Sequence, residues 1–148
     1  MNYLLDTNVV SELARRDADR RLLAWAGSLA EEQVYLSVVT IAEIRKGIAL
    51  LPQGKRRSSL DEWLREGLLD RFRQRIVGVG VEIAELWGLL AAQARSKGAG
   101  FPAMDGFLAA TALKHQFAIA TRNTKDFSQL NVKVINPWLH EPEQGNDL

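Results

Sequence analysis

The stretch Tyr3-Leu4-Leu5-Asp6-Thr7-Asn8 places a short apolar strand directly before an acid. A buried strand cannot carry a carboxylate in its middle without a partner, so we expect Asp6 at the carboxyl end of this strand. At that end a side chain opens onto the crevice where open α/β sheets bind ligands. A helical pattern follows at 9–14. Because Asp6, Thr7 and Asn8 are also residue types that cap helices, capping remains an alternative interpretation.

The composition is that of one globular domain. The 148 residues are 47% hydrophobic and 25% charged, and the net charge of +1 does not indicate a nucleic-acid partner. The apolar runs are shorter than the ~20 residues that cross a bilayer, and Asp6 interrupts the apolar start, so we expect no signal peptide and no membrane association. Cysteine is absent, which excludes disulfides and thiolate metal sites. We expect a cytoplasmic protein.

Short apolar strands alternate with helical patterns along the whole chain. The patterns predict strands at 3–5, 34–39, 76–79, 117–120 and 132–135, and helices at 9–14, 22–29, 40–51, 55–75, 81–97 and 107–113. Such alternation is typical of an α/β domain with a parallel sheet covered on both faces. We find no repeat and no linker, and we expect one domain over 1–138 and a disordered tail over 139–148.

Four acids take equivalent positions in the predicted arrangement of strands and helices. They are Asp6 after the first strand, Glu43 in the helix after the second, Asp105 before the fourth and Asp126, beside Asn123, in the loop after the fourth. If the first and fourth strands are neighbours, these acids meet at one edge of the sheet. Singly, each has a structural alternative: Glu43 in a capping box with Thr40, Asp105 as an N-cap and Asp126 as a turn residue.

Converging carboxylates need a partner. Two of them about 4 Å apart repel by roughly 4 kcal/mol at an effective dielectric near 20, so a cation must neutralise them or one must stay protonated. The potential ligands are oxygen atoms, with no cysteine and no clustered histidine. Oxygen ligands suit Mg²⁺ or Mn²⁺. These ions activate water and polarise phosphates, so the acids indicate metal-assisted hydrolysis of a phosphodiester.

Four motifs in this order resemble the PIN-domain ribonucleases, and among them the VapC-type toxins of bacterial toxin–antitoxin pairs, the FitB-like proteins in particular. The motifs are Leu5-Asp6-Thr7-Asn8-Val9-Val10-Ser11-Glu12, Tyr35-Leu36-Ser37 with Thr40-Ile41-Ala42-Glu43-Ile44, Asp105-Gly106-Phe107-Leu108-Ala109-Ala110-Thr111-Ala112, and Ala120-Thr121-Arg122-Asn123-Thr124, followed by Asn136-Pro137-Trp138. The resemblance runs from Met1 to about Trp138.

The resemblance implies a three-layer α/β/α fold around a five-stranded parallel sheet of order 3-2-1-4-5. It implies Mg²⁺- or Mn²⁺-dependent endonuclease action on RNA, with Asp6, Glu43 and Asp105 as metal-binding acids. The fourth family acid corresponds to Asn123 in the FitB-like proteins and to Asp126 in other members, so both are candidates. The resemblance further implies that three residues orient the carboxylates, namely Thr7, Asn8 and Thr121.

The resemblance also implies partners: a second copy in a homodimer, and a cognate DNA-binding antitoxin with which the chain can form a larger complex on operator DNA. An apolar groove for the antitoxin would use Trp63, Leu64 or Leu68, although their helical spacing also fits a core. Candidate contacts to RNA phosphates lie beside the acids in sequence and are Arg45, Lys46, Arg122 and Lys125.

Other function classes fit less well. A haloacid-dehalogenase-type phosphatase needs an acid where this chain has Asn8, and a receiver domain needs an acid pair in its first loop. A Ser-His-Asp hydrolase lacks a nucleophile elbow here, and the two histidines, His115 and His140, fall in a helix and in the tail. The alternative that remains is a weakly active or inactive PIN protein that acts mainly by helping its antitoxin bind the promoter.

Overall fold

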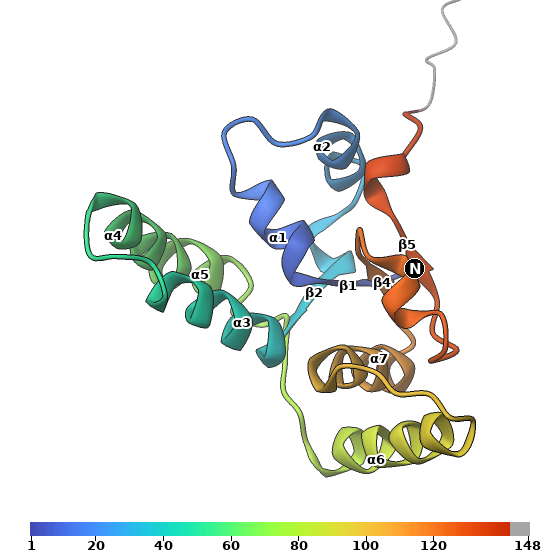
Figure 1. Cartoon of the computed structure of the whole chain (residues 1–148). Coiled ribbons are helices and arrows are strands. Elements are labelled where there is room, and N and C mark those ends of the chain that lie inside the picture. Colours follow the sequence, from blue (N-terminus) through green and yellow to red (C-terminus); the bar gives the residue numbers. More distant parts are fainter. Residues whose placement is uncertain (143–148) are drawn as a thin grey trace, which may run out of the picture.

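A computed structural model of the chain describes residues 1–142 and shows a five-stranded parallel sheet (Figure 1). The strand order is β3-β2-β1-β4-β5. The strands are β1 (Tyr3–Leu5), β2 (Val34–Ser37), β3 (Ile76–Val77), β4 (Ala118–Ala120) and β5 (Val134–Ile135). The order confirms the expected 3-2-1-4-5 arrangement and places β1 in the centre of the sheet.

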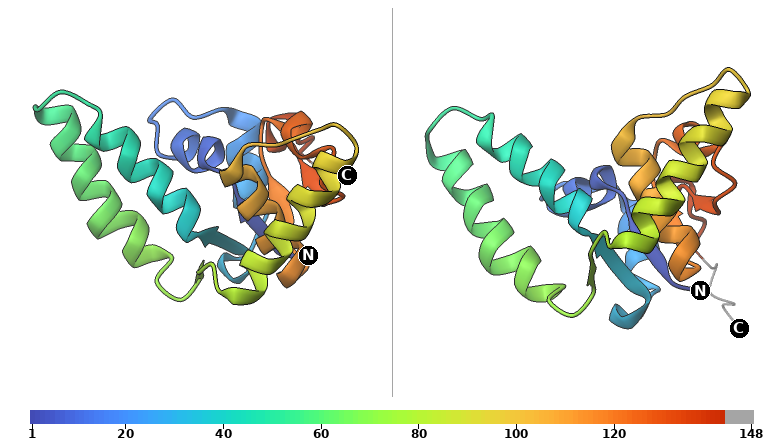
Figure 2. Two further views of the ribbon diagram at one scale, coloured as in Figure 1. Left: turned by 60° about the horizontal axis from the view of Figure 1, so that its bottom comes forward. Right: turned by 90° about the horizontal axis from the view of Figure 1, so that it is seen from below.

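Helices cover both faces, as expected for a three-layer α/β/α domain. They are α1 (Thr7–Leu13), α2 (Arg20–Gly27), α3 (Val38–Ala49), α4 (Lys55–Glu62), α5 (Leu69–Arg71), α6 (Val81–Ser96) and α7 (Ala103–His115). Short helical segments, numbered η here, are η1 (Glu31–Gln33), η2 (Trp63–Leu68), η3 (Thr124–Phe127) and η4 (Pro137–Leu139). Figure 2 shows α3 and the segment from α4 to α5 side by side as one arm, while α6 and α7 lie together on the other side of the sheet.

The central strand divides the core into two apolar clusters. Leu5 faces one cluster with Val9 and Leu36, under α1, α2 and α3, whereas Leu4 faces the other with Leu108 and Ile119, under α7. The alternation follows from the two-residue period of a strand. A strand buried on both faces can carry a polar side chain only where it ends, and β1 ends just before Asp6.

Several boundaries differ from the sequence-based predictions. The second strand stops at Ser37 because its hydroxyl accepts a hydrogen bond from the Val39 backbone N–H at 3.0 Å and thereby begins α3 at Val38. The predicted capping box of Thr40 and Glu43 is therefore wrong. The predicted helix at 55–75 ends at Arg71 and contains a π-helical segment, η2, and β3 is shorter than predicted.

The chain's end differs a little as well. Leu139 belongs to η4, and residues 143–148 of the predicted disordered tail lie outside the described residues, so the domain boundary at Trp138 stays a prediction. No helix within residues 1–142 has both the length and the hydropathy needed to cross a membrane.

Truncating a buried side chain of the central strand should destabilise the fold. Leu4 is fully buried, so Leu4→Ala should lower the free energy of unfolding by about 3 kcal/mol through lost burial and a cavity. Urea denaturation followed by circular dichroism measures this change. Leu89→Ala is the control, since Leu89 is 62% exposed and its truncation should have little effect. Equal losses for the two variants would contradict the proposed core.

Candidate active site

Asp6 is the buried acid at the carboxyl end of β1. One carboxylate oxygen accepts the Thr7 backbone N–H at 2.8 Å, so Asp6 caps α1, and the other accepts the Thr121 hydroxyl at 2.8 Å. Burial raises the pKa of Asp6, the hydrogen bonds from Thr121 and Thr7 lower it, and the Asp126 carboxylate raises it further. The sequence leaves two roles open for Asp6, helix capping and membership of the acid cluster. In the structure Asp6 has both roles.

A polar network fixes Asp6 to the loop after β4. The Asn8 side-chain amide donates to the second Asp6 oxygen at 3.3 Å and to the Thr121 hydroxyl at 3.2 Å. The Asn8 carbonyl oxygen accepts the Arg122 backbone N–H at 3.1 Å, and the Thr121 hydroxyl accepts the Asn123 backbone N–H at 3.0 Å. The residues predicted to orient the acids therefore contact Asp6 directly and tie two distant segments together.

Glu43 faces the same site from α3. The Thr7 hydroxyl donates to a Glu43 carboxylate oxygen at 3.1 Å. Burial raises the pKa of Glu43, the Thr7 hydrogen bond lowers it, the Asp6 carboxylate raises it, and Lys46 lowers it. Thr7 thus links the second acid to the cap of α1.

Asp105 lies in the first turn of α7 and is half-buried. The N-cap of this helix is Pro102, so the N-cap alternative for Asp105 is wrong. Burial, followed by the carboxylates of Asp6, Asp126 and Glu43, raises the pKa of Asp105 from 3.8 to about 6. Burial is thus the main cause of the raised pKa of Asp105, and the three other carboxylates add to it.

Asp126 and Asn123 are the exposed members of the site. Asp126 lies in η3 and affects the pKa of both Asp6 and Asp105, while Asn123 joins through its backbone and has an exposed side chain. Within residues 1–142, no three Asp, Glu, His or Cys side chains are near enough to enclose an ion between them. The acids thus share one electrostatic environment without forming a closed cage.

The sequence does not predict that aromatic side chains pack against the first turn of α7, which carries Asp105. Trp87 of α6, which the helical pattern places in a core, contacts the first turn of α7 through its indole N–H. Gly106 is the available signal, because a glycine inside a helix indicates close approach of a neighbour.

The comparisons with known proteins agree with this geometry. The PIN domain family profile matches residues 3–133. The chain belongs to the PIN domain family. Toxin FitB of Neisseria gonorrhoeae is 42% identical to this PIN domain over 135 residues, which cover 91% of this chain and 97% of FitB. VapC ribonuclease Y4jK of Sinorhizobium fredii is 39% identical, over 91% of this chain and 96% of that protein.

A solved structure shows the same fold. FitAB bound to an IR36 DNA fragment contains a chain that is 40% identical to this PIN domain, with a TM-score of 0.86 over 96% of this chain and 99% of that chain. The shared fold extends over the whole domain, so the elements that carry the acids have counterparts there.

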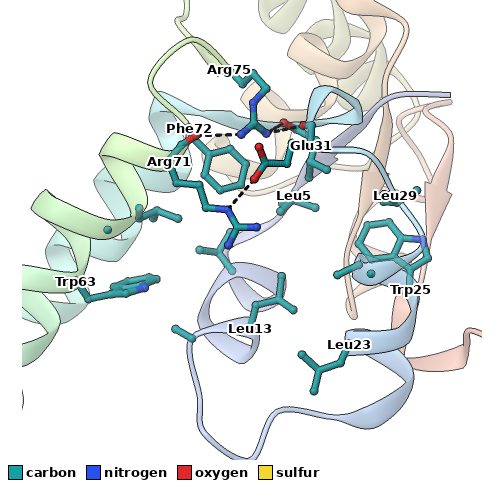
Figure 3. Close-up of a pocket in the computed structure, with 17 residues that line it drawn as sticks. Leu5, Leu13, Leu23, Trp25, Leu29, Glu31, Trp63, Arg71, Phe72 and Arg75 are labelled. Atoms are coloured by element: carbon teal, nitrogen blue, oxygen red, sulfur yellow. Dashed lines mark hydrogen bonds and ion pairs between the residues drawn. The ribbon is translucent and has the colours of Figure 1, made fainter.

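The PIN domain also has an apolar pocket of about 590 Å³ outside the acid cluster (Figure 3). Leu13 of α1, Leu23 and Trp25 of α2 and Trp63 of η2 line its apolar part. Arg71 approaches Glu31 at one side, with 3.6 Å between Nε and Oε1. Leu64 and Leu68 are both buried in the core, and Trp63 and Leu68 also line the pocket.

Removing the Asp105 charge should stabilise the folded protein at neutral pH. Because the folded-state pKa of about 6 exceeds the ordinary 3.8, the proton on Asp105 stabilises the fold below pH 3.8, and this contribution is lost as the pH rises through 6. Asp105→Asn should therefore raise the free energy of unfolding at pH 7.5 by about 1 kcal/mol, after discounting for solvent screening.

Urea denaturation in EDTA at pH 7.5 and at pH 4 measures this effect. The gain of Asp105→Asn over the wild type should shrink at the lower pH. Glu66→Gln, at an exposed position on η2, controls for the loss of one negative charge. A gain that is the same at both pH values would argue against the electrostatic interpretation.

Proposed function

We propose that this PIN domain is a metal-dependent endoribonuclease and the toxin component of a toxin–antitoxin pair. One observation carries the proposal: four acids come from four separate segments around the carboxyl ends of β1 and β4, and burial together with the carboxylates of Asp6, Asp126 and Glu43 raises the pKa of Asp105 to about 6. Such a site is costly without a cation. The names of the relatives, a VapC ribonuclease and toxin FitB, support the assignment.

The donor atoms fit Mg²⁺ or Mn²⁺. The acids Asp6, Glu43, Asp105 and Asp126 offer only oxygen, and Asn123 can add a neutral oxygen. Mg²⁺ keeps several waters and takes one or two carboxylates directly, so it does not require the closed cage that these side chains lack. When bound, such an ion activates water and stabilises charge on the phosphate.

The chain's own residues prepare the site for that ion. Thr121 and Asn8 hold one oxygen of Asp6, and the Thr7 backbone holds the other. The Thr7 hydroxyl orients Glu43. Because these donors are neutral, they orient the carboxylates without competing with a cation for the negative charge.

We further propose a DNA-binding antitoxin and a second copy of the chain as partners. The apolar pocket between α1, α2 and η2 is open on a protein whose structural neighbour is described as a FitAB complex on DNA. An apolar segment of an antitoxin would bury the pocket's leucine and tryptophan side chains. This observation favours a second candidate function, in which the chain mainly tightens promoter binding by the antitoxin.

Asp6→Asn should abolish metal-dependent RNA cleavage and leave the fold intact, because the amide keeps the size of the side chain and its one oxygen can still accept the Thr7 backbone N–H, but the charge that holds a cation is lost. Cleavage of a labelled RNA by antitoxin-free protein, with Mg²⁺ or Mn²⁺ and with EDTA, measures this. Asp19→Asn is the matched control, since Asp19 caps α2 through its side chain and lies outside the site. A folded Asp6→Asn protein with full activity would refute the site, and an inactive wild type would favour the second candidate function.

We propose that Arg122 contacts an RNA phosphate. Its backbone joins the Asn8 network, and its guanidinium lies 5.3 Å from the Trp138 ring centroid. Arg45, by contrast, pairs with Asp61. Among the described residues Arg122 makes no ion pair of its own.

Arg122→Gln should therefore weaken RNA binding several-fold. It should also reduce the slope of log affinity against log salt by about 0.7, the value for one contact to single-stranded RNA. Fluorescence anisotropy in an Asp6→Asn background, which prevents cleavage, gives both quantities. Arg73→Gln is the control, because Arg73 is exposed and pairs with Asp70. An unchanged salt slope would exclude a phosphate contact.

A further inference from the structure

The first turn of α7 carries Asp105 but has little local support. Its N-cap, Pro102, makes no side-chain capping hydrogen bond. The preceding loop contains Gly98 in the left-handed region at φ 71°. An uncapped first turn frays readily, because its backbone N–H groups have no partner within the helix.

Trp87 of α6 packs against this turn. Its indole N–H donates to the backbone carbonyl of Ala103 at 3.0 Å. Its ring stacks on Phe107, with centroids 5.2 Å apart and an interplanar angle of 19°, and meets Phe101 edge-on at 6.2 Å. One side chain thus contacts the helix start, the loop before it and the residue two positions after Asp105.

Gly106 shows how closely the aromatic side chains approach. A Cβ at this position would lie 2.6 Å from the Trp87 indole nitrogen and 2.3 Å from a ring carbon of Phe101. Carbon atoms do not approach so closely, so an alanine would displace the aromatic rings or the turn itself. The residue next to Asp105 therefore has to be glycine for this contact to exist.

The geometry of the helix makes this contact relevant to Asp105. At about 100° per residue, Ala103, Gly106 and Phe107 lie on one face of the turn and Asp105 on the opposite face. Trp87 lies on the α6 side of the turn, where its indole N–H reaches Ala103. A shift of the turn toward or away from α6 would therefore move the Asp105 carboxylate relative to the other acids.

We propose that Trp87 is a positioning residue that fixes the first turn of α7 and thereby holds Asp105 in the acid cluster. The inference rests on the proposed metal site, because its consequence is the affinity of that site for a divalent cation. The contacts of Trp87 are with Ala103, Phe101 and Phe107. It acts through the backbone of the turn that carries Asp105.

Calorimetric titration with Mn²⁺ tests the proposal on the full-length chain. Trp87→Phe keeps an aromatic ring but removes the indole N–H, and it should lower Mn²⁺ affinity about tenfold, the lower end of effects seen for residues that orient metal ligands. Trp63→Phe is the matched control, since it makes the same change in the apolar pocket. Thermal melting in EDTA establishes that both variants are folded.

The outcomes are distinct. Weaker Mn²⁺ binding in Trp87→Phe alone supports the positioning role. Equal Mn²⁺ affinity in the wild type and both variants overturns the positioning role and leaves the proposed nuclease intact. A lower melting temperature of Trp87→Phe with unchanged Mn²⁺ affinity has the same meaning. If the folded wild type binds no Mn²⁺, the metal site and this inference both fail.

Gly106→Ala provides an independent test. It should also weaken Mn²⁺ binding, because its Cβ displaces the same aromatic contact. The double variant with Trp87→Phe should lose less affinity than the product of the two single losses, since both act through one contact. Multiplicative losses would show that the two residues act separately and would overturn the shared mechanism.

Discussion

The hydrogen bond from the Thr121 hydroxyl to the Asp6 carboxylate, 2.8 Å long, is the contact on which the site depends. It joins the ends of β1 and β4, which pair in parallel at the middle of the sheet. Burying a carboxylate is tolerable only when its oxygens are hydrogen-bonded. Thr121, Asn8 and the cap of α1 meet this need, and the same donors fix the direction in which Asp6 faces the other acids.

The acid cluster and the apolar pocket, to which we assign different functions, lie in different parts of the molecule. The acids come from the end of β1 and from α3, α7 and η3, whereas residues of α1, α2 and η2 line the apolar pocket. Helix α1 is common to both, because Asp6 caps its start and Leu13 lines the pocket near its end. A partner in the pocket would therefore contact the helix whose N-terminus holds the central acid.

The sequence predicts the placement of the acids better than the boundaries of the elements. Asp6 and Asp105 could be placed because the carboxyl ends of parallel strands and the N-termini of the connecting helices share one edge of a sheet, while the strand order came from family resemblance. Val38 and Val39 are β-branched and favour a strand, but the Ser37 hydroxyl begins a helix there instead. The aromatic support of Asp105 escaped prediction, because Trp87 and Gly106 become neighbours only when α6 packs on α7.

The position of β1 at the centre of the sheet has a consequence for synthesis. Strand β1 is synthesised before the other strands but pairs with β4. The partner residues in β4 lie more than one hundred positions later, because Leu5 pairs with Ala120. Contacts so distant in sequence slow folding. The acid cluster can therefore assemble only after the segment as far as Asp126 has left the ribosome, so a shorter nascent chain has no complete site.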